Sequence, residues 1–198
     1  AINSINVRTS FNALMRSVDT IMVTNIGSAA ISAVSLVDSL NILIINVFVA
    51  MATGGAIICA QYLGSNQKDK ANQALKQLIF SVTLISILIT IPCIVFRRPL
   101  LTLIFGSVEK SVMDNSLSYL YITALSYPFI ALYNAAAASF RTSQNSILPM
   151  AIAFGSNILN IVGNIFFIFT LSLGVAGAAI STLLSRIVSA LIILILLK

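Results

Sequence analysis

A long apolar run over residues 31–63 constrains the fold of this chain more than any other feature. A helix crosses the hydrocarbon core of a bilayer with about 20 apolar residues, so this run is longer than one crossing needs. We therefore expect a helix that tilts, bends or protrudes, with Thr53-Gly54-Gly55 as the natural bend. Gly27 precedes the run as a helix breaker, and residues 65–70 follow it as an aqueous, net basic loop.

Five further apolar runs repeat this pattern along the chain. Charged residues make up only 8% of the 198 residues, against about a quarter in a soluble domain, so the chain has too little polar surface to be soluble. The composition predicts an all-α integral membrane protein, a bundle of six transmembrane helices. Residues 100–105 are apolar but too short to cross, which favours an interfacial helix. The predicted spans are 11–25, 31–63, 78–96, 117–140, 149–171 and 175–197.

The eleven lysines and arginines are scattered between the apolar runs and form no basic stripe, so we expect no nucleic-acid partner. Among those outside the spans, six lie on the side of the N-terminus and three on the opposite side, which places both termini in the cytoplasm, although Arg97-Arg98 argues the other way. The chain has no histidine, which removes imidazole-based catalysis and metal sites, and we predict no enzymatic activity. Cys59 and Cys93 lie inside apolar runs, where thiols pack as small hydrophobes.

One carboxylate, Asp19, lies in the middle of the first predicted span. An ionisable group at bilayer depth is expensive to keep and marks a functional site by default. It is either a protonatable or cation-binding carboxylate, or an ion pair with Arg16, one turn away on the same helix face.

Other polar residues lie in the later spans. Asn157, Asn160 and Asn164 recur at i, i+3 and i+7, which makes one polar stripe that either faces a water-filled cavity or joins helices through hydrogen bonds. Asp38 lies about two turns into its span, where it reaches either a cavity or the headgroup zone, and Arg186 either faces protein or snorkels. The hydroxyls of the last span can bond back to their own helix; they belong to Ser181, Thr182, Ser185 and Ser189.

Several motifs together resemble the N-terminal lobe of multidrug and toxic compound extrusion (MATE) transporters. The resemblance covers nearly the whole chain, and the combination of motifs is specific although each piece alone is not. In the first half the motifs are Val18-Asp19-Thr20-Ile21-Met22-Val23, residues 29–34, Thr53-Gly54-Gly55 and Gln61-Tyr62-Leu63-Gly64. In the second half they are residues 141–149, Asn160-Ile161-Val162-Gly163-Asn164 followed by residues 166–169, and residues 174–182.

The resemblance implies a fold of two six-helix lobes with a substrate cavity between or within them, in which residues 1–198 form the first lobe. It implies that Asp19 is the proton or sodium coupling site, with Asn160, Asn164 and Thr182 in a hydrogen-bond network around it. Many members of the family have aspartate at the position of Asn164. The neutral amide therefore leaves Asp19 as the main titrating group and makes tight sodium binding at Asp19 less favourable.

The function implied is a lobe of an antiporter in the cytoplasmic membrane that exports small organic compounds, often cationic, in exchange for protons or sodium ions. No cofactor beyond the coupling ion is expected. The expected partners are the substrate, the lipid bilayer and a second lobe, either a C-terminal half or another copy. Candidate cavity-lining residues are Asp38, Asn41, Asn157, Tyr133, Phe154 and Met22, although core packing is the alternative for Tyr133, Phe154 and Met22.

Three other functions are compatible with the sequence. A lipid-linked saccharide flippase of the same superfamily shares the helix layout but tends to use a more basic cavity. A non-transporting remnant would keep the lobe without its partner half, since the chain ends where a first lobe would end. An intramembrane aspartyl protease is suggested only by Asp19 and Asp38, neither of which lies in a Gly-Asp motif.

Overall fold

The computed structural model describes residues 27–143 and 145–197. The first predicted span, residues 11–25, and with it Asp19, lies outside the described residues. The regular elements in the described part are all helical, as the sequence predicts. They are α2 (Ser28–Gly64), α3 (Lys68–Val95), α4 (Arg97–Phe105), α5 (Lys110–Ala124), α6 (Tyr127–Thr142), α7 (Ile147–Asn164), the π-helix η1 (Ile165–Thr170) and α8 (Gly174–Leu196).

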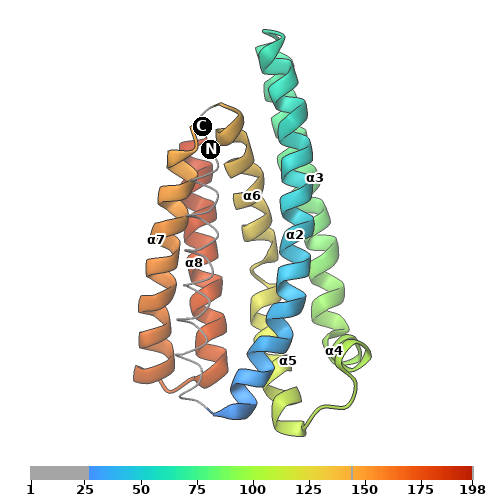
Figure 1. Cartoon of the computed structure of the whole chain (residues 1–198), viewed down its shortest axis with the longest axis vertical. Helices are drawn as coiled ribbons and strands as arrows, with labels where there is room; N and C mark the ends of the chain where they lie inside the picture. Colours follow the sequence, from blue (N-terminus) through green and yellow to red (C-terminus); the bar gives the residue numbers. More distant parts are fainter. Residues whose placement is uncertain (1–26, 144, 198) are drawn as a thin grey trace.

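The described helices form a bundle in which two helical hairpins flank a broken helix (Figure 1). The α2–α3 hairpin packs on one side of the α5–α6 segment, and the α7–α8 hairpin packs on the other side, mainly through α8. The core between them is rich in small side chains, and the run Ala135 to Ala138 on α6 is fully buried. Small residues let helix backbones approach closely in lipid, as this run predicts.

Helix α2 has the length that its apolar run predicts. Gly27 precedes it with a φ of 126°, a left-handed value that a side chain would strain. The helix continues through the expected bend at Thr53-Gly54-Gly55 without a break, and its end projects beyond the other helices together with the start of α3 (Figure 1). The aqueous loop is shorter than the predicted 65–70, because α3 already begins at Lys68.

The predicted span 117–140 is a broken helix in the structure. Helix α5 ends at Ala124 and α6 begins at Tyr127, with the two axes bent by 45°. The cause is Pro128, which has no N–H for the Ala124 carbonyl and whose ring crowds that carbonyl. The Thr90 hydroxyl of α3 donates to the Ser86 carbonyl at 2.7 Å and lies 3.5 Å from the Ala124 oxygen.

Four described helices are long and apolar enough to cross a membrane, namely α2, α3, α7 with η1, and α8. The bent pair α5–α6 is long and apolar enough when its two halves are taken together as one span, which brings the number to five. These match the five predicted spans that fall within the described residues, and large apolar side chains on them face outward, as a lipid environment requires. The short helix α4 lies across the direction of the bundle in Figure 1 and buries Leu101 while Leu103 is 85% exposed.

Candidate functional site

Three polar side chains form a hydrogen-bonded chain between α7 and α8, which we call the amide–hydroxyl cluster: Asn160, Asn164 and Thr182. The Asn164 Nδ2 donates to Asn160 Oδ1 at 3.3 Å, and the Asn160 Nδ2 donates to Thr182 Oγ1 at 3.2 Å. Thr182 in turn donates to the carbonyl of Ala178 at 3.0 Å. The structure therefore brings these three residues together, with Asn164 only 2% exposed.

Two glycines allow α7 and η1 to lie close enough to α8 for these bonds. A Cβ on Gly163 would collide with the Ser181 hydroxyl, and a Cβ on Gly177 would lie 2.9 Å from the backbone carbonyl of Phe167. At the same contact the Ser181 hydroxyl donates to the Asn160 backbone carbonyl at 2.6 Å. The cluster thus sits where two helices touch at backbone distance.

The helical geometry changes directly after the cluster. Helix α7 ends at Asn164, and the chain continues as the π-helix η1 from Ile165. A π-helical turn is rare and often marks a functional site, because it shifts the register of the side chains that follow. Here it places the buried Asn164 at the junction of the two helix types.

The chemistry of the amide–hydroxyl cluster limits what it can bind. Its amide and hydroxyl groups are neutral and offer both donors and oxygen acceptors. Oxygen acceptors of this kind can ligate a hard cation such as sodium, and the donors can orient a carboxylate. Because no member is ionisable near neutral pH, a proton or cation site here needs an acid from elsewhere. Asp19, the acid expected in this role, and Met22 lie outside the described residues.

The other predicted residues of this region are placed differently. Asn157 is half-buried and makes no hydrogen bond to another residue in the described ranges. Tyr133 is buried, and its hydroxyl donates to the Pro149 carbonyl at 2.7 Å, so it ties α6 to α7. Phe154 is 52% exposed on α7. Tyr133 therefore has a packing and hydrogen-bonding role between α6 and α7, and the lining of a cavity by Asn157 and Phe154 stays a prediction.

A second polar network surrounds Asp38, the other acid that the sequence singled out. Asp38 Oδ1 accepts from Asn41 Nδ2 and from the Tyr119 hydroxyl, both at 3.2 Å. The Tyr127 hydroxyl donates to Asn41 Oδ1 at 2.7 Å, and Asn41 is buried. We call these four residues the Asp38 network; it joins α2 to both halves of the broken helix.

Arg186 faces protein, which decides between the two alternatives left by the sequence. Its Nη1 donates to the Ser126 hydroxyl at 2.7 Å, inside the break between α5 and α6. Sequence reasoning missed Tyr119, Ser126 and Tyr127 as polar partners. The only signal was Pro128, which predicts freed backbone groups and nearby side chains to pair with them.

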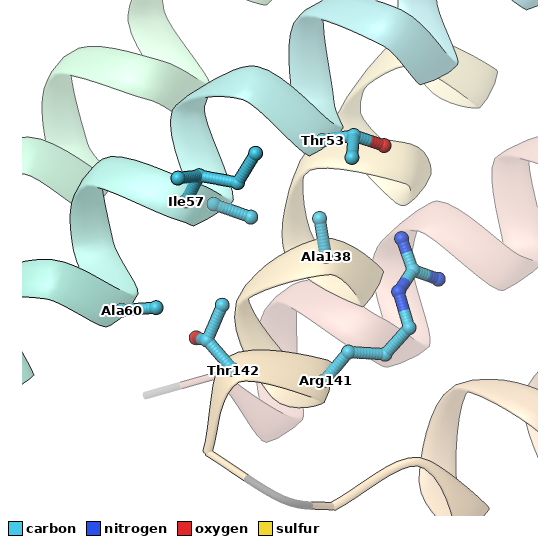
Figure 2. A pocket seen from close by; sticks show the side chains of 7 residues that line it. Thr53, Ile57, Ala60, Ala138, Arg141 and Thr142 are labelled. Atoms are coloured by element: carbon cyan, nitrogen blue, oxygen red, sulfur yellow. The ribbon is translucent and has the colours of Figure 1, made fainter. Parts of the chain in front are cut away.

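A shallow groove lies between α2 and α6 (Figure 2). Figure 2 shows Ile57 and Ala60 of α2 on one side and Ala138 and Thr142 of α6 on the other. Its volume is about 240 Å³, below the roughly 300 Å³ at which pockets for drug-sized ligands begin. The groove is lined by Thr53, Ala56, Ile57, Ala60, Ala138, Arg141 and Thr142, and it shares no residue with the amide–hydroxyl cluster.

These features define a class of protein. A bundle of membrane-spanning helices that holds polar side chains in its interior, next to a broken helix, is typical of membrane transporters. The sequence model of the MatE family matches residues 7–166. The chain therefore belongs to the MatE family.

Known proteins agree with this assignment. The chain is 30% identical over 188 residues to the uncharacterized transporter YisQ of Bacillus subtilis (strain 168), covering 92% of this chain and 40% of YisQ. It superposes with a TM-score of 0.87 at 24% identity on an outward-facing multidrug resistance MATE family transporter, covering 93% of this chain and 41% of that one.

A second solved structure, a MOP superfamily transporter from Pyrococcus furiosus, also gives a TM-score of 0.87 at 24% identity, with 93% of this chain and 40% of that one covered. It is described as having a binding pocket of reverse polarity that suggests a different function. The chain thus spans about two fifths of the length of the relatives it matches. The comparisons point to transport rather than catalysis by a multi-pass membrane protein.

Proposed function

We propose that this chain is the N-terminal lobe of an exporter of small organic compounds, often cationic, driven by the return of protons or sodium ions across the cytoplasmic membrane. The observation that carries the proposal is the hydrogen-bonded chain from Asn164 through Asn160 to Thr182. It lies inside the bundle and offers donors and oxygen acceptors at one place. Its amide and hydroxyl groups can exchange hydrogen-bond partners when an ion arrives.

In this mechanism Asp19 carries the coupling charge, and the amide–hydroxyl cluster sets its affinity for the ion. The Thr182 hydroxyl accepts from Asn160 and donates to Ala178, and a hydroxyl oxygen is also a type of ligand that sodium accepts. The amide of Asn164 adds no charge, and Asp19 then remains the main acid of the site. The second lobe, either a C-terminal half or another copy, completes the substrate cavity, and both termini lie in the cytoplasm.

The lipid-linked saccharide flippase is less well supported by the charges inside the described spans. A pyrophosphate group needs unengaged cations, and Arg186 is the basic residue that the described part holds deep in a span. Its guanidinium already donates to Ser126 and interacts electrostatically with the Asp38 carboxylate. A cation that is already compensated attracts an anionic headgroup weakly.

The proposal is tested in the full-length protein, reconstituted into liposomes, by comparing Thr182→Ser with Thr182→Val. Valine keeps the shape of threonine but removes the hydroxyl, whereas serine keeps the hydroxyl. Efflux of a fluorescent organic cation is measured under a proton gradient and under a sodium gradient. We expect Thr182→Val to weaken ion-driven efflux about tenfold, the size of a typical coupling effect, and Thr182→Ser to retain it.

Ser189→Ala on the same helix is the matched control, because its hydroxyl bonds only to carbonyls of its own helix. Asp19→Asn should abolish coupling. Wild-type ion dependence in both Thr182→Val and Asp19→Asn would refute the assignment. Ion-driven movement of a lipid-linked saccharide in place of the organic cation would favour the flippase.

A further inference from the structure

Arg186 and Thr182 occupy one face of α8, since residues four apart lie one turn above each other on a helix. Thr182 belongs to the amide–hydroxyl cluster, and Arg186 reaches the α5–α6 break through Ser126. Both residues lie within the continuous helix α8. One turn of α8 therefore has the candidate ion site at one end and the broken helix at the other.

The charge of Arg186 is compensated inside the lobe. The Asp38 carboxylate and the hydroxyls of Tyr119 and Tyr127 lie near enough to Arg186 to interact with it electrostatically. Asp38 is itself held by Asn41 and Tyr119, and Asn41 by Tyr127. A nearby carboxylate offsets part of the cost of burying a guanidinium in a low-dielectric interior.

The break interrupts the helical path between α5 and α6. The two half-helices meet at 45°, and Ser126 lies in the two-residue gap between them. Its backbone N–H donates to the Thr123 carbonyl at 3.0 Å, and its hydroxyl donates to the same carbonyl at 2.5 Å. Broken helices in transporters act as hinges, and freed carbonyls line their interior sites.

We propose that Arg186 is a positioning residue for ion coupling: it fastens the Thr182 turn of α8 to the α5–α6 break, so that ion binding at the amide–hydroxyl cluster and the angle of the broken helix depend on each other. This role rests on the proposed function. Because coupling is reciprocal, loosening the attachment changes the affinity of the cluster for its ion even though Arg186 does not touch that ion. The residues that carry it are Arg186 and Ser126, with Asp38 as the counter-charge.

The test uses the full-length protein in liposomes, in whichever gradient drives the wild type. Arg186→Gln and Ser126→Ala each remove the attachment from one end, and Arg186→Lys keeps the charge. We expect both removing variants to raise the half-saturating ion concentration about tenfold while the half-saturating substrate concentration changes less than about twofold. Arg186→Lys should recover part of the ion affinity. Ser189→Ala on the next turn should behave as wild type.

The outcomes separate the two proposals. If Arg186→Gln and Ser126→Ala lower the maximal transport rate but leave the ion affinity unchanged, the role of Arg186 is only structural. That result overturns the positioning role and leaves the proposed function standing. If Arg186→Gln fails to fold, Ser126→Ala and Arg186→Lys decide the question by the same criterion. If neither a proton nor a sodium gradient drives the wild type, the proposed function falls, and the role of Arg186 falls with it.

Discussion

The contact of Gly177 with η1 allows a quantitative prediction for Gly177→Ala. The added Cβ would lie 2.9 Å from both the carbonyl carbon and the carbonyl oxygen of Phe167, and 3.1 Å from its Cβ. Ordinary carbon contacts lie at about 3.5–4.0 Å, so backbone must move by several tenths of an ångström. No side-chain rotation can relieve this clash, because the nearest atoms belong to the main chain.

Two opposing effects decide the magnitude. Overpacking by one methyl group typically lowers the free energy of unfolding by about 1–3 kcal/mol. Replacing glycine by alanine inside a helix raises it by about 0.5–1 kcal/mol, because the unfolded chain has less freedom to lose. The net expectation is a loss of about 1 kcal/mol, which lowers the melting temperature of a lobe of this size by about 2–4 °C.

The matched control is Gly155→Ala in α7. A Cβ there meets no other atom of the described residues within 4 Å, so only the favourable helix effect remains, and the melting temperature should stay the same or rise. Unfolding is followed in the full-length protein with a dye that fluoresces on reaction with thiols, since Cys59 and Cys93 are both buried. Equal melting temperatures for Gly177→Ala and Gly155→Ala would refute the close approach of α8 and η1.

Three further outcomes are expected. Tyr133→Phe removes the buried bond to the Pro149 carbonyl and should lower the free energy of unfolding by about 0.5–1.5 kcal/mol in the same thiol-dye assay; an unchanged melting temperature would contradict that bond. Asn164→Asp adds a carboxylate to the amide–hydroxyl cluster. If Asp19 is the coupling acid, the second carboxylate should lower the sodium concentration that half-saturates transport. A sodium dependence equal to that of the wild type would argue against a cation site at the cluster. Cys59 and Cys93 should resist a water-soluble maleimide in the folded protein and remain reduced; rapid labelling would show that α2 and α3 pack more loosely than described.

The location of the spans was predictable from the sequence because of how backbone groups behave in lipid. Without water to bond to, a chain in the bilayer must satisfy its N–H and C=O groups within each segment, which makes every long apolar run a helix. The runs at 31–63, 149–171 and 175–197 accordingly form α2, α7 with η1, and α8. The break at Pro128 was the exception, since a proline inside a membrane helix is compatible with a straight, kinked or broken span.

The hydrogen-bond partners of the polar side chains could not be predicted from the sequence in the same way. Resemblance to a known family groups Asn160, Asn164 and Thr182 at one site, whereas periodicity leaves Asp38 and Arg186 with two alternatives each. Tyr119 lies 81 residues from Asp38 along the chain, and Ser126 lies 60 residues from Arg186. Nothing local in the sequence connects such pairs.

The sequence by itself thus determined that this protein is a bundle of membrane helices with a few polar residues kept inside it. The tertiary structure decided which of those residues meet, that Arg186 reaches Ser126 across the break, and that Tyr133 ties α6 to α7. The physical reason lies in the solvent. Lipid is as apolar as the protein interior, so the outward and inward faces of a membrane helix look alike in sequence, and only the packing of neighbouring helices sets its rotation.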